Sequence, residues 1–156
     1  MNVFEDDNIN CAVQEHSKEL LKEARKYLAG TELGAVIELD NVNKISSDGF
    51  LHGADGGFTV SIPKCKSPGV TIHNHPSGET FSVRDIHKFG ADTYASAMYV
   101  VGNNGKCYAL KKNSNFNDCW SKLTLKITQI EFGLSGHSVN DILSGAEEYG
   151  LKYYEK

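Results

Sequence analysis

Two histidines separated by one residue are the side chains in this sequence best suited to metal chemistry. They are His73 and His75, in the stretch TIHNHP that begins at Thr71. Residues 70–75 are predicted to form a strand, and side chains two apart in a strand project from the same face. Imidazole is a common metal ligand in proteins. The spacing therefore predicts a pair of metal ligands on one face of a strand, which ends at Pro76.

A carboxylate follows at a distance that can complete this pair. Ser77 and Gly78 allow the chain to reverse, and Ser82 opens a predicted helix that carries Asp85 in its first turn. Two histidines and one carboxylate leave a fourth tetrahedral position open for water, as a catalytic zinc requires. We therefore expect a zinc site. The Ser-x-x-Asp spacing is also that of an ordinary capping box, which is the structural alternative.

Hydrolysis at a zinc site also needs a carboxylate that takes the proton of the attacking water. Residues 33–39, LGAVIEL, predict a largely buried strand. Glu32 and Glu38 lie at its beginning and end, six residues apart and nominally on one face. This spacing does not choose between the two glutamates.

The motif His-x-His-Pro followed by Ser-x-x-Asp resembles the signature of the JAMM/MPN family of metalloproteases. HNHPSG with SVRDI is similar to the RadC-type bacterial branch of that family. The resemblance reaches over roughly residues 10–112 and implies an α/β fold of JAMM/MPN (cytidine-deaminase-like) architecture. It also implies a zinc ion held by His73, His75 and Asp85. Families of this kind hydrolyse peptide or isopeptide bonds, often releasing ubiquitin or ubiquitin-like modifiers.

Two further residues receive a role from this resemblance. Ser82 would assist the tetrahedral intermediate, and an upstream glutamate would act as general acid and base. The family places that glutamate after the first helix, at the start of the first strand, which matches Glu32 better than Glu38. The implied activity is a zinc-dependent peptidase or isopeptidase that acts on a protein or peptide, including ubiquitin-like conjugates.

The loop within the motif departs from the family pattern. Five residues separate Pro76 from Ser82, whereas the usual pattern has six. The shorter form is similar to domains of phage head-morphogenesis proteins and bacterial polymorphic toxins. Two alternatives therefore stand beside the enzyme: a catalytically silent binding module with the JAMM fold, of phage or toxin origin, and a RadC-like protein associated with DNA.

Composition limits the class of protein. The 156 residues are 40% hydrophobic and 23% charged, which predicts a single globular domain. The resemblance implies that this is one JAMM-like domain over residues 1–156, with its core at about 10–112 and C-terminal helices at about 116–156. A net charge of −4 gives no overall attraction to nucleic acid or anionic lipid, so neither is an expected partner. No stretch resembles a membrane span or signal peptide, so we expect a cytoplasmic protein, or one delivered as an effector or phage component.

The four cysteines form no Cys-x-x-Cys pair and are expected to be reduced.

Periodicity and turn residues predict the elements that position these side chains. The predicted helices cover residues 10–29, a short segment from 82, 120–134 and 138–149, and the predicted strands cover 33–39, 58–62, 70–75, 98–101 and 107–110. Short strands and turns are expected between 41 and 57. This order predicts a mixed β-sheet flanked by helices. The C-terminal EEYGLKYYEK has two interpretations, a frayed helix or a peptide-facing surface.

Overall fold

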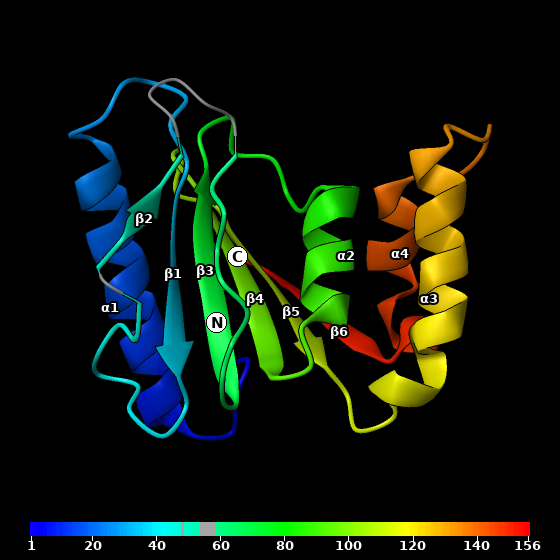
Figure 1. Ribbon diagram of the computed structural model, residues 1–156, viewed down its shortest axis with the longest axis horizontal. Coiled ribbons are helices and arrows are strands. Elements are labelled where there is room, and N and C mark those ends of the chain that lie inside the picture. Colours follow the sequence, from blue (N-terminus) through cyan, green and yellow to red (C-terminus); the bar gives the residue numbers. More distant parts are fainter. Residues whose placement is uncertain (48, 54–58) are drawn as a thin grey trace.

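The computed structural model describes residues 1–47, 49–53 and 59–156. Six strands form one mixed sheet in the order β2-β1-β3-β4-β5-β6 (Figure 1). The strands are β1 (Leu33–Glu38), β2 (Leu51–His52), β3 (Gly69–His75), β4 (Ala95–Gly102), β5 (Cys107–Lys112) and β6 (Leu151–Glu155). The helices are α1 (Asp7–Ala24), α2 (Val83–Ala91), α3 (Phe116–Glu131), α4 (Val139–Ser144) and the 3-10 helix η1 (Ala146–Tyr149). β3 and β4 are parallel, and α2 forms the crossover that parallel neighbours require, whereas the other pairs are antiparallel.

Helices cover both faces of the sheet (Figure 1). α1 packs against one face, and α2, α3 and α4 lie over the other. Side chains alternate along β4: Ala97, Tyr99 and Val101 pack on the α1 side, whereas Met98 and Val100 pack on the α2 side. All five are buried, because the centre of the sheet is covered from both directions.

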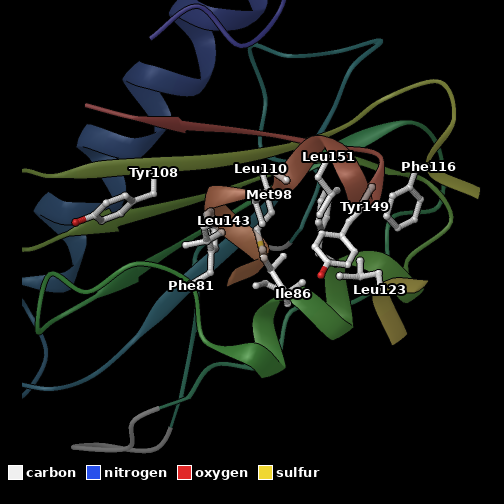
Figure 2. Packing of buried hydrophobic residues seen from close by; sticks show 14 of the residues in the cluster. Phe81, Ile86, Met98, Tyr108, Leu110, Phe116, Leu123, Leu143, Tyr149 and Leu151 are labelled. Carbon is white, nitrogen blue, oxygen red and sulfur yellow. The ribbon is translucent and has the colours of Figure 1, made fainter. Parts of the chain in front are cut away.

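The core on the α2 side fixes the position of α2 (Figure 2). Ile86 of α2, Leu123 of α3 and Leu143 of α4 belong to one apolar cluster with Met98 and Leu110 of the sheet. Ile86 and Leu123 are fully buried, and complete burial of such a side chain stabilises a fold by about 1.5–3 kcal/mol. The packing of Ile86 therefore holds the first turn of α2 over the sheet.

β3 is the strand that positions the two histidines. Val70 and Ile72 pack in the apolar cluster on the α1 side. His73 and His75 line a cavity on the α2 side, together with Thr71. The predicted shared face of the two histidines is therefore confirmed. Because β3 is paired with β1 on one side and β4 on the other, its backbone is held from both directions.

Most predicted elements are confirmed, with small shifts in their ends. The class is α/β, with a mixed sheet flanked by helices, and β4 and β5 form the predicted antiparallel pair. The predicted helix 10–29 is α1, which begins after the N-cap Asp6 and ends at Ala24. The four cysteines are free, as expected. Within the described ranges, no helix has the length and apolar character needed to cross a membrane.

Three predicted elements differ from the structure. No strand forms over residues 59–62, and residue 58 of that predicted strand lies outside the described residues. This segment instead borders the cavity on the α2 side of the sheet, where Ile62 packs over Gly34 of β1. The predicted helix 120–134 begins earlier, at Phe116, and ends at Glu131, shortly before Gly133 with a φ of +66°. The predicted helix 138–149 is divided into α4 and η1.

The C-terminal segment is a strand, so the interpretation as a frayed helix is wrong. Leu151–Glu155 forms β6, antiparallel to β5, and Leu151 is fully buried. Gly150, with a φ of +68°, ends η1 and turns the chain into the strand. A Cβ atom at this glycine would also collide with the backbone of Phe116. The expectation that only helices follow residue 116 is therefore wrong for residues 151–155, which form β6.

Candidate metal centre

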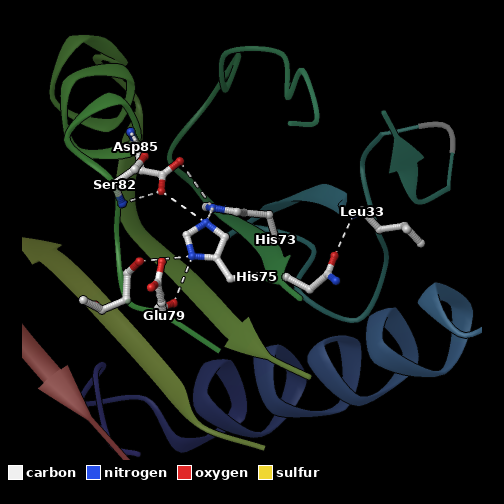
Figure 3. Close-up of polar contacts among 8 residues, drawn as sticks. Leu33, His73, His75, Glu79, Ser82 and Asp85 are labelled. Atoms are coloured by element: carbon white, nitrogen blue, oxygen red, sulfur yellow. Dashed lines mark hydrogen bonds and ion pairs between the residues drawn. The ribbon is translucent and has the colours of Figure 1, made fainter. Parts of the chain in front are cut away.

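The structure brings together the three side chains that the sequence predicts as metal ligands. His73 and His75 lie at the end of β3, and Asp85 reaches them from the first turn of α2 (Figure 3). The two Nε2 atoms are 3.1 Å apart. Asp85 carboxylate oxygens lie 3.4 Å from Nε2 of His73 and 3.3 Å from Nε2 of His75. In the part of the chain that the structure describes, this is the one group of His, Cys, Asp or Glu side chains that could hold a metal ion.

The short loop between β3 and α2 brings Asp85 within reach. The N–H of Gly78 donates to the carbonyl oxygen of His75 over 2.9 Å, so the chain reverses directly after the strand. Gly78 has a φ of +78°, and a Cβ atom at this position would collide with the Asn104 side chain. The five-residue loop, one shorter than the family pattern, therefore still places Asp85 against both histidines.

Backbone carbonyls determine which nitrogen of His75 carries the proton. Nδ1 lies 2.9 Å from the carbonyl oxygen of Glu79 and 3.1 Å from that of Thr80. A carbonyl oxygen can only accept, so Nδ1 donates, and the neutral ring keeps its lone pair on Nε2. Metal-binding histidines are usually oriented in this way, through the nitrogen that does not bind the metal. Nδ1 of His73 is buried and, among the described residues, has no such partner.

The contacts within this centre shift the pKa values of Asp85 and His75. Burial alone would raise the pKa of the Asp85 carboxyl, but hydrogen bonds from His73 and His75 outweigh burial and hold this pKa well below its usual range. Burial would lower the pKa of His75, but its hydrogen bonds to Asp85 and to the Glu79 backbone overcome this effect and raise it. The centre therefore keeps an ionised carboxylate beside two imidazoles.

The spacing of the two imidazole nitrogens, with a carboxylate oxygen near each, is close to that of ligands around one tetrahedral ion. With zinc bonds of roughly 2.0–2.1 Å, neighbouring ligand atoms lie about 3.3 Å apart. In the structure the two Nε2 atoms are 3.1 Å apart, Oδ1 of Asp85 lies 3.4 Å from His73 and Oδ2 lies 3.3 Å from His75, so one ligand atom per residue lies within 4.8 Å of the others. Two imidazole nitrogens and one carboxylate oxygen are also a donor set that suits zinc. His73, His75 and Asp85 could therefore hold a metal ion without rearrangement of the fold.

Of the two glutamates considered as proton acceptor, the structure brings Glu32 to the centre. Glu32 directly precedes β1 and lines the same cavity as the two histidines. Burial raises the pKa of Glu32, and the charges of the nearby histidines partly oppose this rise. Glu38 pairs with Gly69 at the far end of the β1–β3 ladder, whereas Gly34 pairs with His73. These two pairs are four residues apart, which corresponds to about 13 Å along a strand.

Ser82 is the N-cap of α2, and its capping box is complete. Its Oγ accepts the N–H of Asp85 over 3.1 Å, and its own N–H donates to Oδ2 of Asp85 over 2.8 Å. The structural interpretation of the Ser-x-x-Asp motif is therefore confirmed. The box also orients the candidate ligand, because the same Oδ2 atom faces His75. Capping and metal binding are thus compatible functions of one motif.

Asn74 links β3 to the start of β1, although the sequence alone gave this residue no role. Asn74 lies between the two histidines, points to the opposite face and is fully buried. Its Oδ1 accepts the N–H of Leu33 over 2.6 Å (Figure 3), and its Nδ2 donates to Oδ1 of Asn103 over 3.2 Å. The first bond fixes the start of β1 and so the adjacent Glu32. The sequence holds one indication of this role: Asn74 is a polar residue on the strand face that otherwise packs in an apolar cluster, where a buried polar group needs a hydrogen-bond partner.

A cavity of about 860 Å³ adjoins the centre. Apolar side chains from several elements line it, among them Ile62, Phe81, Met98 of β4 and Leu143 of α4. Ile62 packs over Gly34, where any Cβ atom would collide with the Ile62 side chain. The volume is in the range of pockets that bind small molecules or short peptide segments. The candidate metal centre therefore borders a space that a substrate can enter.

Comparison with known proteins assigns no family to the chain. It matches no protein-family model, no curated protein and no solved structure. The resemblance to the JAMM/MPN family therefore depends on the motif itself, and the functional inference depends on the geometry of His73, His75 and Asp85.

Proposed function

We propose that this protein is a zinc-dependent hydrolase of JAMM-like architecture that cleaves a peptide or isopeptide bond in a protein substrate, ubiquitin-like conjugates included. One observation carries the proposal: one potential ligand atom from each of His73, His75 and Asp85 lies within 4.8 Å of the other two, on the wall of a cavity that Glu32 also lines. In this proposal His73, His75 and Asp85 hold the zinc ion. A bound zinc supplies a Lewis acid that polarises a carbonyl group and lowers the pKa of water.

Glu32 is the proton-transfer residue in this proposal. It lines the cavity, is partly buried and stands outside the group of three potential ligands. Its carboxylate oxygen accepts the proton of the attacking water and passes it to the leaving amine. The hydrogen bond from the N–H of Leu33 to Asn74 supports this role, because it holds the residue next to Glu32 in place.

Ser82 has a structural and a catalytic role in the proposal. Its Oγ accepts the N–H of Asp85, and this leaves the hydroxyl proton available for donation to another atom. Ser82 also lines the cavity. Its hydroxyl can therefore stabilise the oxygen that becomes negatively charged during attack on a carbonyl group.

The catalytically silent binding module is the main competitor of this proposal. The shortened loop before Ser82 is the sequence feature that favours it. Asp85 nevertheless contacts both histidines, which supports a complete ligand set. The RadC-like role in association with DNA gains no support from the net charge of −4.

Metal analysis of protein purified without added zinc tests the centre. We expect stoichiometric zinc in the wild type and almost none in His73→Ala and His75→Ala, because each variant removes one of three ligands. His52→Ala is the control, since His52 is exposed and does not line the cavity. Stoichiometric zinc in both variants of the strand histidines contradicts the site.

A peptidase assay tests the activity. Wild-type protein should release products from generic peptides or from ubiquitin-like conjugates, a chelator should stop the release, and added zinc should restore it. Glu32→Gln should keep its zinc and lose the activity, because the amide cannot accept the proton. Stoichiometric zinc without release of product from any of these substrates favours the silent binding module.

A further inference from the structure

The cavity beside the metal centre forms a groove with two walls. One wall is the 59–65 segment, which runs beside β3 on the side of α2, and the other is α2 (Figure 1). The N–H of Cys65 donates to the Asp92 carboxylate over 3.0 Å and fastens the 59–65 segment at its end. Ile62 fastens it near the centre by packing over Gly34. This α2 groove extends from the metal centre to the C-terminal end of α2.

The floor of the α2 groove is apolar. Met98 and Ala95 of β4 contribute to it, with Phe89 of α2 and Ile62 of the 59–65 segment. Met98, Ala95 and Phe89 also belong to the buried core, so these side chains are fixed in position. A rigid apolar floor binds apolar side chains by removing them from water.

Three cationic side chains line the α2 groove, namely Lys64, Arg84 and Lys88. All three are exposed. Among the described residues none of them forms an ion pair, whereas Lys18 and Lys26 on other surfaces pair with nearby glutamates. In a chain with a net charge of −4, the groove is therefore a local concentration of unpaired positive charge.

The carboxylates in the groove do not cancel these cations. Asp85 faces the two histidines, and the Asp92 oxygens accept two backbone N–H groups. Glu32 precedes β1, and Glu79 belongs to the loop before α2, so both lie toward the metal centre. The side of the groove formed by α2 and the 59–65 segment therefore remains basic.

We propose that the α2 groove binds an extended peptide segment in which large apolar residues alternate with acidic residues. The apolar side chains pack on the floor, and the acidic side chains meet Lys64, Arg84 and Lys88. This inference rests on the proposed function, because the bound segment continues to the metal centre, where it is cleaved. A basic segment of equal apolar content is repelled by the same three cations, so charge determines which segments bind.

Two synthetic peptides test this preference. They share alternating leucines and a neutral fluorophore, and they differ only in having glutamate or lysine between the leucines. Fluorescence anisotropy with the full zinc-loaded chain should show at least about tenfold tighter binding of the glutamate peptide, and rising salt should reduce the difference. Equal binding of the two peptides, or tighter binding of the lysine peptide, overturns the proposal.

Charge reversal locates the binding surface. Arg84→Glu combined with Lys88→Glu should weaken binding of the glutamate peptide roughly tenfold or more. The control combines Lys22→Glu with Lys44→Glu, which are exposed, lie outside the groove and change the net charge equally. The control should bind like the wild type. Equal weakening in both double variants means that overall charge attracts the peptide, and this overturns the proposal.

Hydrolysis in the same samples, followed by mass spectrometry, separates this inference from the proposed function. Selective binding without hydrolysis supports the groove and counts against the enzyme. Hydrolysis of both peptides at equal rates supports the enzyme and overturns the charge preference. The last measurement compares binding of the glutamate peptide with binding of a labelled single-stranded oligonucleotide of similar length. If it binds more tightly than the glutamate peptide and Arg84→Glu with Lys88→Glu abolishes this binding, the groove is a nucleic-acid site and the peptide proposal is wrong.

Discussion

Two buried polar clusters flank α2, and their charged groups are accommodated in different ways. At the N-terminal end, atoms of His73, His75 and Asp85 converge on one another at 3.1 to 3.4 Å. At the C-terminal end, the Asp92 carboxylate accepts two backbone N–H groups, at 3.0 and 3.3 Å. The first cluster is made of atoms that can share a cation, and the second is made of atoms that already have partners.

Lys112 of β5 completes the second cluster. Its Nζ donates to the main-chain oxygen of Asp92 and lies 4.8 and 4.9 Å from the ring centroids of Phe89 and Phe116. Burial lowers the pKa of Lys112 to about 8, although the nearby Asp92 charge opposes this shift. These contacts fasten β5 to the end of α2. Burial and charge are thus common to both clusters, whereas potential ligand atoms that converge on one another beside a cavity are found in the first.

The largest expected difference between the clusters at the two ends of α2 is in their effect on the rate of hydrolysis. Glu32→Gln should lower hydrolysis by roughly a hundredfold to ten-thousandfold, because the amide keeps the shape of the side chain but cannot accept a proton. Zinc content and melting temperature should stay at wild-type values. Glu38→Gln is the matched control and should leave the rate unchanged, since Glu38 lies at the far end of β1. A rate loss in Glu38→Gln alone means that Glu38, and not Glu32, is the proton acceptor.

Asp92→Ala should reduce stability and leave the metal centre intact. It removes the acceptor of two backbone N–H groups, and loss of these charged hydrogen bonds should lower the free energy of unfolding by about 2–4 kcal/mol. Urea denaturation measures this change, and metal analysis of the folded variant should give the zinc content of the wild type. Loss of zinc from folded Asp92→Ala shows that the two clusters are coupled, contrary to the comparison.

Ser82 and Ser138 allow a matched test, because each opens a helix and donates its N–H to the carboxylate of an aspartate three residues later. Either serine replaced by alanine should cost about 0.5–2 kcal/mol of stability. Ser82→Ala should in addition lower the rate per folded molecule about a hundredfold, as loss of an oxyanion donor does. If the two variants keep equal rates, the capping box explains Ser82 completely.

Asn74→Ala tests how Glu32, the proposed general base, is positioned. The N–H of Leu33 loses its acceptor, which should cost about 1–3 kcal/mol of stability and displace Glu32. The Michaelis constant should change less than the turnover number, because proton transfer is affected more than binding. Asn103→Ala removes the other partner of Asn74 and is the control. An equal loss of turnover in both variants argues for a general structural effect.

The smallest expected effect is on how the stability of the metal-free protein depends on pH. The lowered pKa of Asp85 gives stability that is present above the unfolded value of about 4 and is lost as the pH falls through the folded value. The raised pKa of His75 gives stability that is present below about 6.5 and is lost as the pH rises through the folded value. The stability difference between wild type and Asp85→Asn should therefore be greater at pH 5.5 than at pH 8.5. A difference that does not change contradicts this assignment.

The parts of the site that could be predicted from sequence have local causes. His73 and His75 share a face because they are two apart in a strand, and Asp85 reaches them because Ser82 starts a helix three residues earlier. Asn74 was not identified, because its partner Leu33 is 41 residues away and nothing near Asn74 in the sequence indicates that bond.

The errors in the predicted fold have the same origin. Residues 59–62 alternate as a strand does, but Ile62 packs over Gly34 on the face of the sheet instead of joining its edge. Residues 151–155 carry two tyrosines and follow a helical pattern, so the strand becomes evident only when β5 offers its edge. In both cases, contacts with distant parts of the assembled sheet accompany the conformation, and local sequence does not reveal such contacts.

The two outer strands also affect how the protein behaves at high concentration. An outer strand exposes unpaired N–H and C=O groups, and a second chain can add to them and begin an aggregate. β2 is two residues long, which is too short to act as a template. β6 carries the exposed charged residues Lys152 and Glu155, and burying these charges against another copy would be unfavourable. Both edges of the sheet therefore oppose edge-to-edge self-association, one by its shortness and the other by its charges.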